Sequence, residues 1–196
     1  MKSRKQVHEF WKNPNYANLP EKYLQGKERT DFLVKKIRGN FDTDATILEI
    51  GCNVGRNLHG LFSAGYKNLY GIEINENAIK EMQKHFPKMA ESIKIYNLPA
   101  EYAILNIPAN SIDVIFTMAV LEHIHDESDF IFQKMKEVAK KAIVTIEDEV
   151  KASERHEPRN YSEIFNCKKF QEKESAHNLN LPGLSKRFVY RYFEVI

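Results

Sequence analysis

The sequence predicts an α/β fold, in which one seven-stranded, mostly parallel sheet carries helices on both faces. Two observations predict it. Short β-rich runs alternate with helical patterns over most of the chain, and two further strand candidates follow near its end. A length of 196 residues fits one domain of this kind. No internal repeat or low-complexity segment divides the chain, so we expect a single domain over 1–196.

The strands of this sheet are expected where β-branched and apolar residues cluster between turn residues. Five of them come first, at Thr46–Ile50, Leu69–Ile74, Ile93–Tyr96, Ile112–Thr117 and Ala142–Ile146. The two terminal strands are expected at Lys168–Ser175 and Arg187–Val195.

Helices are expected between these strands and before the first of them. One begins near Gly55, and another runs over Ala78–Phe86 with Asn75 as its N-cap and Pro87 at its end. A later helix starts near Ser128 and carries an apolar face of Ile131, Met135 and Val138. The remaining helix candidates are Val7–Lys12, Glu21–Arg38 and Tyr161–Phe165.

Composition limits the class of protein. The hydrophobic fraction of 42% indicates a globular chain, and 29 Lys and Arg against 27 Asp and Glu leave a net charge of only +2. So small a charge argues against a nucleic-acid partner. The first ten residues contain no apolar run, and no stretch approaches the ~20 apolar residues of a membrane span. With only two cysteines, we expect a cytoplasmic protein without a disulfide framework or a membrane partner.

The strongest functional signal lies where the first strand runs into the next helix. The strand ends at a turn bounded by Gly51 and Gly55, so backbone N–H groups are exposed at the carboxyl edge of the sheet, where α/β folds bind ligands. Glu73 ends the second strand about 20 residues later, at the distance where such folds place an acid for ribose hydroxyls. An NAD site would require G-x-G-x-x-G, which this turn lacks.

These residues carry a resemblance to a known family. The run Leu48–Gly55 resembles the first motif of class I S-adenosyl-L-methionine-dependent methyltransferases, usually E-x-G-C-G-x-G. Gly71–Glu73 resembles the second motif, and 111–124 resembles the fourth-strand motif of the small-molecule, type 11/12-like branch. The resemblance implies a Rossmann-like fold, S-adenosyl-L-methionine as cofactor and S-adenosyl-L-homocysteine as product. It divides the chain into an N-terminal helical cap (1–44), a cofactor-binding core (45–147) and C-terminal strands with a substrate-side loop (148–196).

The resemblance also implies which residues bind the cofactor. The turn after the first strand is expected to wrap its methionine part, Glu73 to hold the ribose and Ile74 to pack on adenine. The full set is Glu49, Gly51, Cys52, Asn53, Gly55, Glu73, Ile74, Ala100, Glu101, Met118 and Ala119. Asn53 replaces the middle glycine of the motif. Because Asn adopts left-handed turns more readily than other non-glycine residues, we expect the turn to keep its shape.

Two residues are predicted to act on the acceptor. His123 follows the fourth strand and is expected to accept the proton of an acceptor hydroxyl. Glu147 ends the fifth strand and begins an acidic run over 147–149, which could accept hydrogen bonds from a polyol. Some methyltransferases bind a divalent ion through E-x-x-E-H. Here Ala119 stands at the first of those positions, so no metal site is predicted.

Three functions remain open at this point. The first is methyl transfer to a small molecule, with the hydroxyl of a sugar or a sugar-like metabolite as one candidate acceptor. The second is methylation of tRNA or protein, against which stands the absence of a dense basic stripe. The third is a non-catalytic cofactor-binding module, because motifs indicate binding and not turnover. The sequence predicts neither the acceptor nor the oligomeric state.

Overall fold

In the computed structural model, which describes residues 2–196, all strands belong to one sheet. The strand order is β3-β2-β1-β4-β5-β7-β6. The first five strands in this order are parallel, and β7 then runs antiparallel to both β5 and β6. The predicted seven-stranded, mostly parallel sheet is therefore confirmed. The strand bounds are β1 Ile47–Ile50, β2 Leu69–Ile72, β3 Lys94–Tyr96, β4 Ile112–Met118, β5 Ala139–Asp148, β6 Phe170–Ala176 and β7 Phe188–Val195.

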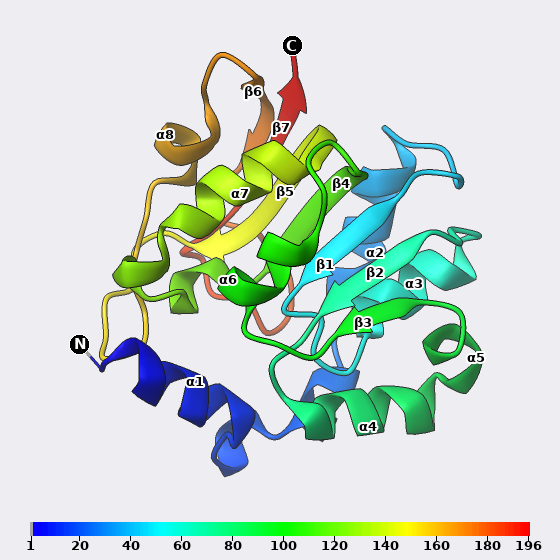
Figure 1. Ribbon diagram of the computed structural model, residues 1–196, viewed down its shortest axis with the longest axis vertical. Helices are drawn as coiled ribbons and strands as arrows, with labels where there is room; N and C mark the ends of the chain where they lie inside the picture. The colour runs from blue at the N-terminus through cyan, green and yellow to red at the C-terminus, as the bar shows by residue number, and fades with distance from the viewer. Residues whose placement is uncertain (1) are drawn as a thin grey trace.

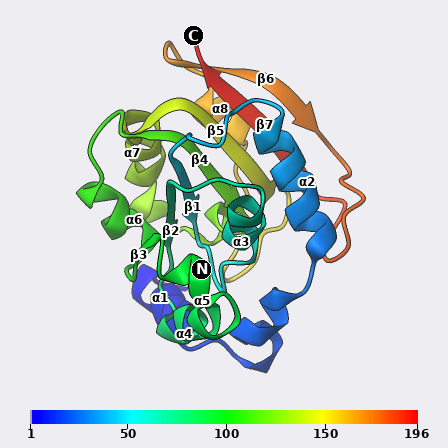
Figure 2. The same cartoon turned by 90° about the vertical axis from the view of Figure 1, so that its right-hand side faces the viewer.

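Helices cover both faces of this sheet. Figure 2 shows the layers, with α2 and α3 on one side of the strands and α6 and α7 on the other. Short 3-10 turns connect several of these elements. The helix bounds are α1 Arg4–Lys12, α2 Lys27–Arg38, α3 Arg56–Ser63, α4 Glu76–His85, α5 Pro87–Ala90, α6 Ala100–Ala103, α7 Phe130–Val138 and α8 Tyr161–Phe165. None of the described helices is both long and apolar enough to cross a lipid bilayer.

The core consists of two apolar clusters, one on each face of the sheet. Successive strand residues point to opposite faces, so Ile47 packs in the cluster under α2 and α3, whereas Leu48 packs in the cluster under α7 and α8. All four residues of β1 are buried. Because the central strands are apolar on both sides, they read in the sequence as continuous runs without alternation.

The predicted helix over Glu21–Arg38 is wrong in its first part. A 3-10 turn occupies Pro20–Leu24, and α2 begins only after Gly26, whose φ of 102° lies in the left-handed region. Such a backbone angle interrupts a right-handed helix. Elsewhere the capping prediction is confirmed, since the Asn75 side chain accepts hydrogen bonds from the backbone N–H groups of Asn77 and Ala78.

The N-terminal helix lies apart from both helical layers. Figure 1 shows α1, in blue, along the lower edge of the molecule near α4. Its residues Val7, His8 and Trp11 line the same cavity as the residues that follow β1, β2 and β4. This helix therefore covers the carboxyl edge of the sheet, where α/β folds bind their ligands.

Candidate active site

A cavity of about 410 Å³ lies at the carboxyl edge of the central strands. Its walls come from the turns after β1, β2 and β4, from α1 and from the loop after β5. Of the predicted cofactor-binding residues, only Gly55 does not line it. Those that do are Glu49, Gly51, Cys52, Asn53, Glu73, Ile74, Ala100, Glu101, Met118 and Ala119.

The turn after β1 has the left-handed conformation that its sequence predicts. The φ angles are 72° at Gly51, 47° at Asn53 and 73° at Gly55, so asparagine adopts the left-handed conformation at the position where the motif has glycine. A Cβ on Gly51 would lie 2.4 Å from Cγ2 of Val120, which is a steric overlap. Gly55 instead serves as the N-cap of α3. The turn therefore depends on both glycines, one for close approach and one for starting the helix.

Glu73 projects into the cavity from the end of β2. Its Oε2 accepts a hydrogen bond from the Asn53 N–H at 2.8 Å, and its Oε1 accepts one from the Asn75 N–H at 2.8 Å. Burial raises the pKa of this carboxyl group. Each oxygen keeps a further lone pair, because a carboxylate oxygen can accept two hydrogen bonds. The carboxylate is thus fixed in orientation and still able to accept from a ligand.

Glu49 is the second buried acid of the cavity, with a relative exposure of only 2%. Its Oε1 accepts a hydrogen bond from Nδ2 of Asn57 at 2.8 Å. Its Oε2 is buried and has no hydrogen-bond partner among the described residues. Burial raises the pKa of Glu49 to about 8, against the opposing effect of the Asn57 hydrogen bond. A buried carboxylate with one unpartnered oxygen is suited to a cationic ligand.

Glu101 ties the N-terminal helix to the body of the domain. Its Oε1 lies 2.7 Å from Nε2 of His8 in α1 and accepts a hydrogen bond from the Ser128 hydroxyl at 3.0 Å. Burial alone raises the pKa of Glu101, but the contact with His8, a hydrogen bond from the backbone N–H of Glu101 itself and the Ser128 hydroxyl outweigh it and lower the pKa overall. Glu101 therefore fixes α1 over the cavity as well as lining its wall.

The turn after β4 is strained and is held by a buried acid. Ala119 has a φ of 58°, a left-handed conformation that a non-glycine residue rarely adopts and that is often found at functional sites. Oε2 of Glu147 accepts hydrogen bonds from the N–H groups of Val120 and Leu121 at 2.9 and 3.0 Å. Burial and the nearby Glu122 carboxylate raise the pKa of Glu147 well above its usual range.

This arrangement overturns the prediction that Glu147 contacts the acceptor. Its side chain is fully buried under the turn and does not line the cavity, so Glu147 is a positioning residue. The rest of the acidic run is also engaged elsewhere. Asp148 pairs with Arg187 at 2.8 Å and Glu149 with Arg191 at 2.7 Å. The run that suggested a polyol acceptor is therefore not available to bind one.

His123, in contrast, lines the cavity as predicted. Its Nδ1 donates a hydrogen bond to the carbonyl oxygen of Arg155 at 2.9 Å, because a carbonyl can only accept, and its lone pair is therefore on Nε2. That Nε2 lies 3.7 Å from Oε1 of Glu122. Burial lowers the pKa of His123 to about 3, so the ring is neutral at physiological pH.

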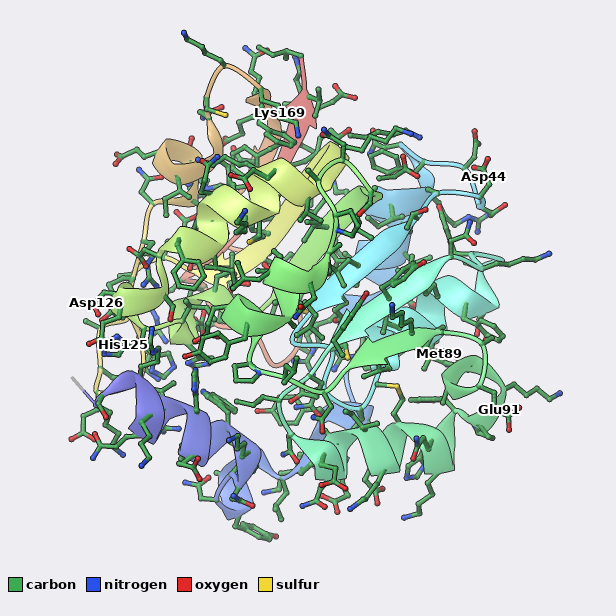
Figure 3. All side chains as sticks on the ribbon, viewed as in Figure 1. Asp44, Met89, Glu91, His125, Asp126 and Lys169 are labelled. Carbon is green, nitrogen blue, oxygen red and sulfur yellow. The ribbon has the colours of Figure 1, made fainter. Side chains whose placement is uncertain are left out.

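Several residues outside the predicted set of site residues also line the cavity. Arg56 donates to the carbonyl oxygens of Tyr23 and Gln25, which joins the segment before α2 to the start of α3. His125, in the same loop as His123, also lines the cavity, and Figure 3 shows it with Asp126 beside α1. The loop after β5 contributes Lys151, Arg155 and His156. No local motif marks these residues, because only the folded loops bring them together.

Sequence comparisons match about half of this chain to known proteins. Residues 48–143 match the family model described as a methyltransferase domain. A curated relative, an uncharacterised protein from Haemophilus influenzae, is 29% identical over 96 residues, which are 49% of this chain. The matched region spans only 38% of the length of that relative.

Solved structures extend the likeness to the whole chain. Magnesium protoporphyrin IX methyltransferase from Synechocystis PCC 6803, in a crystal structure with bound SAM, aligns with a TM-score of 0.73 and 13% identity. The alignment covers 100% of this chain and 97% of that one. A protein described as a [4+2]-cyclase aligns with a TM-score of 0.67 and 11% identity, over 86% of this chain and 80% of that one. Such low identities show a shared fold, which by itself fixes no reaction.

The family match spans the turn after β1, Glu73 and the turn after β4, which are the parts of the chain that build the cavity. The glycine turn, the buried acid Glu73 and the predicted sheet order occur together, in the expected order along the chain. Residues 48–143 of this chain thus match a methyltransferase domain, and the whole chain shares the fold of solved S-adenosylmethionine-dependent methyltransferases.

Proposed function

We propose that this protein binds S-adenosylmethionine in the cavity and transfers its methyl group to a small molecule. The observation that carries the proposal is the pair of buried acids, Glu49 and Glu73, on either side of the turn after β1. Burying two carboxylates costs free energy unless a ligand or the protein pairs them. S-adenosylmethionine carries a cationic amino group and a ribose diol, which are the groups that two such carboxylates would bind.

Glu73 is suited to the ribose. Its two oxygens are fixed by the Asn53 and Asn75 N–H groups and can each accept one hydroxyl of a vicinal diol. Ile74 and Leu98 line the cavity beside it and offer apolar surface to the adenine ring. Glu101 stands at the same end, already paired with His8.

Glu49 is suited to the amino group of the methionine part. Glu49 lines the cavity together with Gly51 and Met118, at the methionine end that the family resemblance implies, and its buried Oε2 has no hydrogen-bond partner among the described residues. An ammonium group there would form a charge-assisted hydrogen bond and remove the cost of the buried, unpaired oxygen. The chain thus offers a partner for each polar end of the cofactor.

The acceptor end of the cavity is cationic and aromatic. Lys151 and Arg155 line it from the loop after β5, and Trp11 lines it from α1. The acidic run 147–149 is engaged in contacts away from the cavity. It therefore cannot bind a sugar hydroxyl, which was the acceptor that this run suggested. The side chains that do line this end favour a small acceptor with an anionic group, since they would neutralise its charge on binding.

S-adenosylmethionine supplies an electrophilic methyl group, so the protein has to orient the acceptor and exclude water. A hydroxyl acceptor must also lose its proton, and we propose that His123 accepts this proton. Its Nδ1 is engaged by the Arg155 carbonyl, which leaves the Nε2 lone pair for this task.

Incubation of the protein with labelled S-adenosylmethionine and fractionated metabolites tests the catalytic proposal. We expect label to appear in a small, anionic compound, retained on an anion exchanger. Label in tRNA or protein fractions, with none in metabolites, would contradict a small-molecule acceptor. Absence of label everywhere, with intact cofactor binding, would favour a non-catalytic cofactor-binding module.

A further inference from the structure

Three metal-ligating side chains converge beside the acceptor end of the cavity. Glu122 and His123 belong to the turn after β4, and His156 belongs to the loop after β5. Oε1 of Glu122 lies 3.7 Å from Nε2 of His123 and 3.9 Å from Nε2 of His156, and all three atoms lie within 4.8 Å of one another. These distances are too long for direct hydrogen bonds.

In each of the three side chains, the second nitrogen or oxygen atom is in contact with another polar group of the protein. Nδ1 of His123 donates to the Arg155 carbonyl at 2.9 Å, and Nδ1 of His156 lies 2.5 Å from the Ser153 hydroxyl. The other oxygen of Glu122 accepts from the Asp148 N–H at 2.6 Å. Outer contacts of this kind orient metal ligands in proteins and fix the tautomer of ligating histidines.

Inside the cluster, the side chains direct lone pairs at one another. Nε2 of His123 carries a lone pair because its Nδ1 holds the ring proton, and it faces the carboxylate oxygen of Glu122. The Glu122 side chain is only 5% exposed, so water screens this contact poorly. Two acceptors that face each other in a buried place repel unless a positive charge or a shared proton lies between them.

We propose that Glu122, His123 and His156 bind a divalent transition-metal ion. Two imidazoles and one carboxylate suit zinc, manganese or cobalt better than calcium or magnesium, which prefer all-oxygen sites. Ligands about 2.1 Å from a tetrahedral ion lie roughly 3.4 Å apart, so closure onto an ion requires a few tenths of an ångström for the two contacts with Glu122 and up to about 1.4 Å for the two histidine nitrogens, which lie within 4.8 Å of each other.

This site reverses the expectation that the chain lacks a metal. That expectation rested on Ala119, which interrupts the local E-x-x-E-H pattern. The missing ligand is supplied instead by His156 from another loop, where the sequence pattern cannot show it. Glu122 and His123 alone would form an incomplete pair of ligands.

An ion at this position would act on the acceptor. Three protein ligands leave at least one coordination position open, and His123 and His156 both line the cavity. An ion there would lower the pKa of an acceptor hydroxyl, whose proton would pass to solvent. The acceptor oxygen would then form the bond to the methyl carbon of S-adenosylmethionine while the carbon–sulfur bond breaks and its electron pair goes to sulfur. In the metal-bound protein, His123 is thus a ligand, and the ion lowers the pKa of the acceptor.

Metal binding can be measured without the cofactor. Untagged protein is stripped with a chelator, dialysed and titrated with Co²⁺, with visible absorption and calorimetry as readouts, and then with Zn²⁺. We expect one equivalent to bind and the d–d bands of a low-symmetry site to appear. His156→Ala should weaken Co²⁺ binding at least tenfold, whereas His177→Ala, an exposed histidine after β6, should leave it unchanged.

Thermal melting and S-adenosylhomocysteine affinity of His156→Ala check that the variant folds, and Glu122→Gln provides a second ligand variant of similar shape. Failure of the parent protein to bind Co²⁺ or Zn²⁺ at millimolar concentration would overturn the proposal. Equal Co²⁺ affinity in the parent and in folded His156→Ala would overturn it as well. Because no cofactor is present in the titration, either result leaves the proposed methyl transfer untouched.

Discussion

The indole ring of Trp11 packs against the imidazole ring of His123, with 4.6 Å between the ring centroids. This contact joins the N-terminal helix to the turn after β4, across the acceptor end of the cavity. His8, one helical turn earlier, pairs with Glu101 at the other end. Helix α1 is thus attached at both ends of the cavity, and a bound ligand would be enclosed between it and the sheet.

Trp11 offers a direct optical test of this enclosure. It is the only tryptophan in the chain, so tryptophan emission reports on a single position in the wall of the cavity. Addition of S-adenosylhomocysteine should shift the emission to shorter wavelength, because ligand displaces water beside the indole. The variant Trp11→Phe, which has no tryptophan, gives the background emission. An unchanged emission spectrum, under conditions where calorimetry detects binding, would show that α1 does not lie over the ligand.

Glu73 should contribute strongly to cofactor affinity. Replacement by alanine removes the proposed ribose partner and also leaves the Asn53 and Asn75 N–H groups without their acceptor. We expect binding of S-adenosylhomocysteine to weaken by about 1–3 kcal/mol, or roughly 5- to 150-fold in dissociation constant. Glu76→Ala, with an exposed side chain at the start of α4, is the matched control. Equal affinities of the two variants would assign the ribose to other residues.

Cofactor affinity should depend on pH through Glu49. In the free protein burial raises the pKa of Glu49 to about 8, so at pH 6 the carboxyl group is mostly protonated. Pairing with the ammonium group of the cofactor requires the carboxylate, and binding below pH 8 therefore releases a proton. Affinity should rise with pH between 6 and 7.5, by at most about tenfold per unit.

Calorimetry in buffers of different ionisation enthalpy measures this proton release directly. Glu49→Gln keeps the side-chain shape and removes the titration, so its affinity should be lower and independent of pH in this range. A parent protein whose affinity is flat over the same range would rule out the pairing of Glu49 with the amino group.

His123 should affect turnover more than cofactor binding. We expect His123→Gln to lower kcat by about 10²–10⁴-fold while the dissociation constant of S-adenosylhomocysteine stays nearly unchanged. Chelation of the parent protein should lower kcat as well, and Mn²⁺ or Zn²⁺ should restore it. If chelation leaves kcat unchanged while His123→Gln loses activity, the imidazole removes the proton itself without an ion.

The parts of this structure that the sequence predicts are those with a local signal. Gly51 and Gly55 mark their turn because their backbone angles require glycine, and Asn75 marks a helix start through its own side chain. Strand positions follow from apolar runs that are buried on both faces. All but one of the residues expected to bind the cofactor therefore line the cavity.

The acceptor side has no such signal. Glu147 was expected to face the acceptor, but the direction of a side chain on a doubly buried strand cannot be deduced from periodicity, and it points under the turn after β4. His156 meets Glu122 only through the path of the loop after β5. Contacts between distant loops decide this end of the cavity, so its residues become visible only in the folded chain.

Binding of S-adenosylmethionine in the cavity is measured by isothermal titration of the protein with S-adenosylhomocysteine. We expect one site with a dissociation constant in the micromolar range, and thermal stabilisation of about 2.7 kcal/mol at a hundredfold excess over that constant. Absence of binding heat with both S-adenosylhomocysteine and S-adenosylmethionine, together with an unchanged melting temperature at saturating concentration, would contradict it.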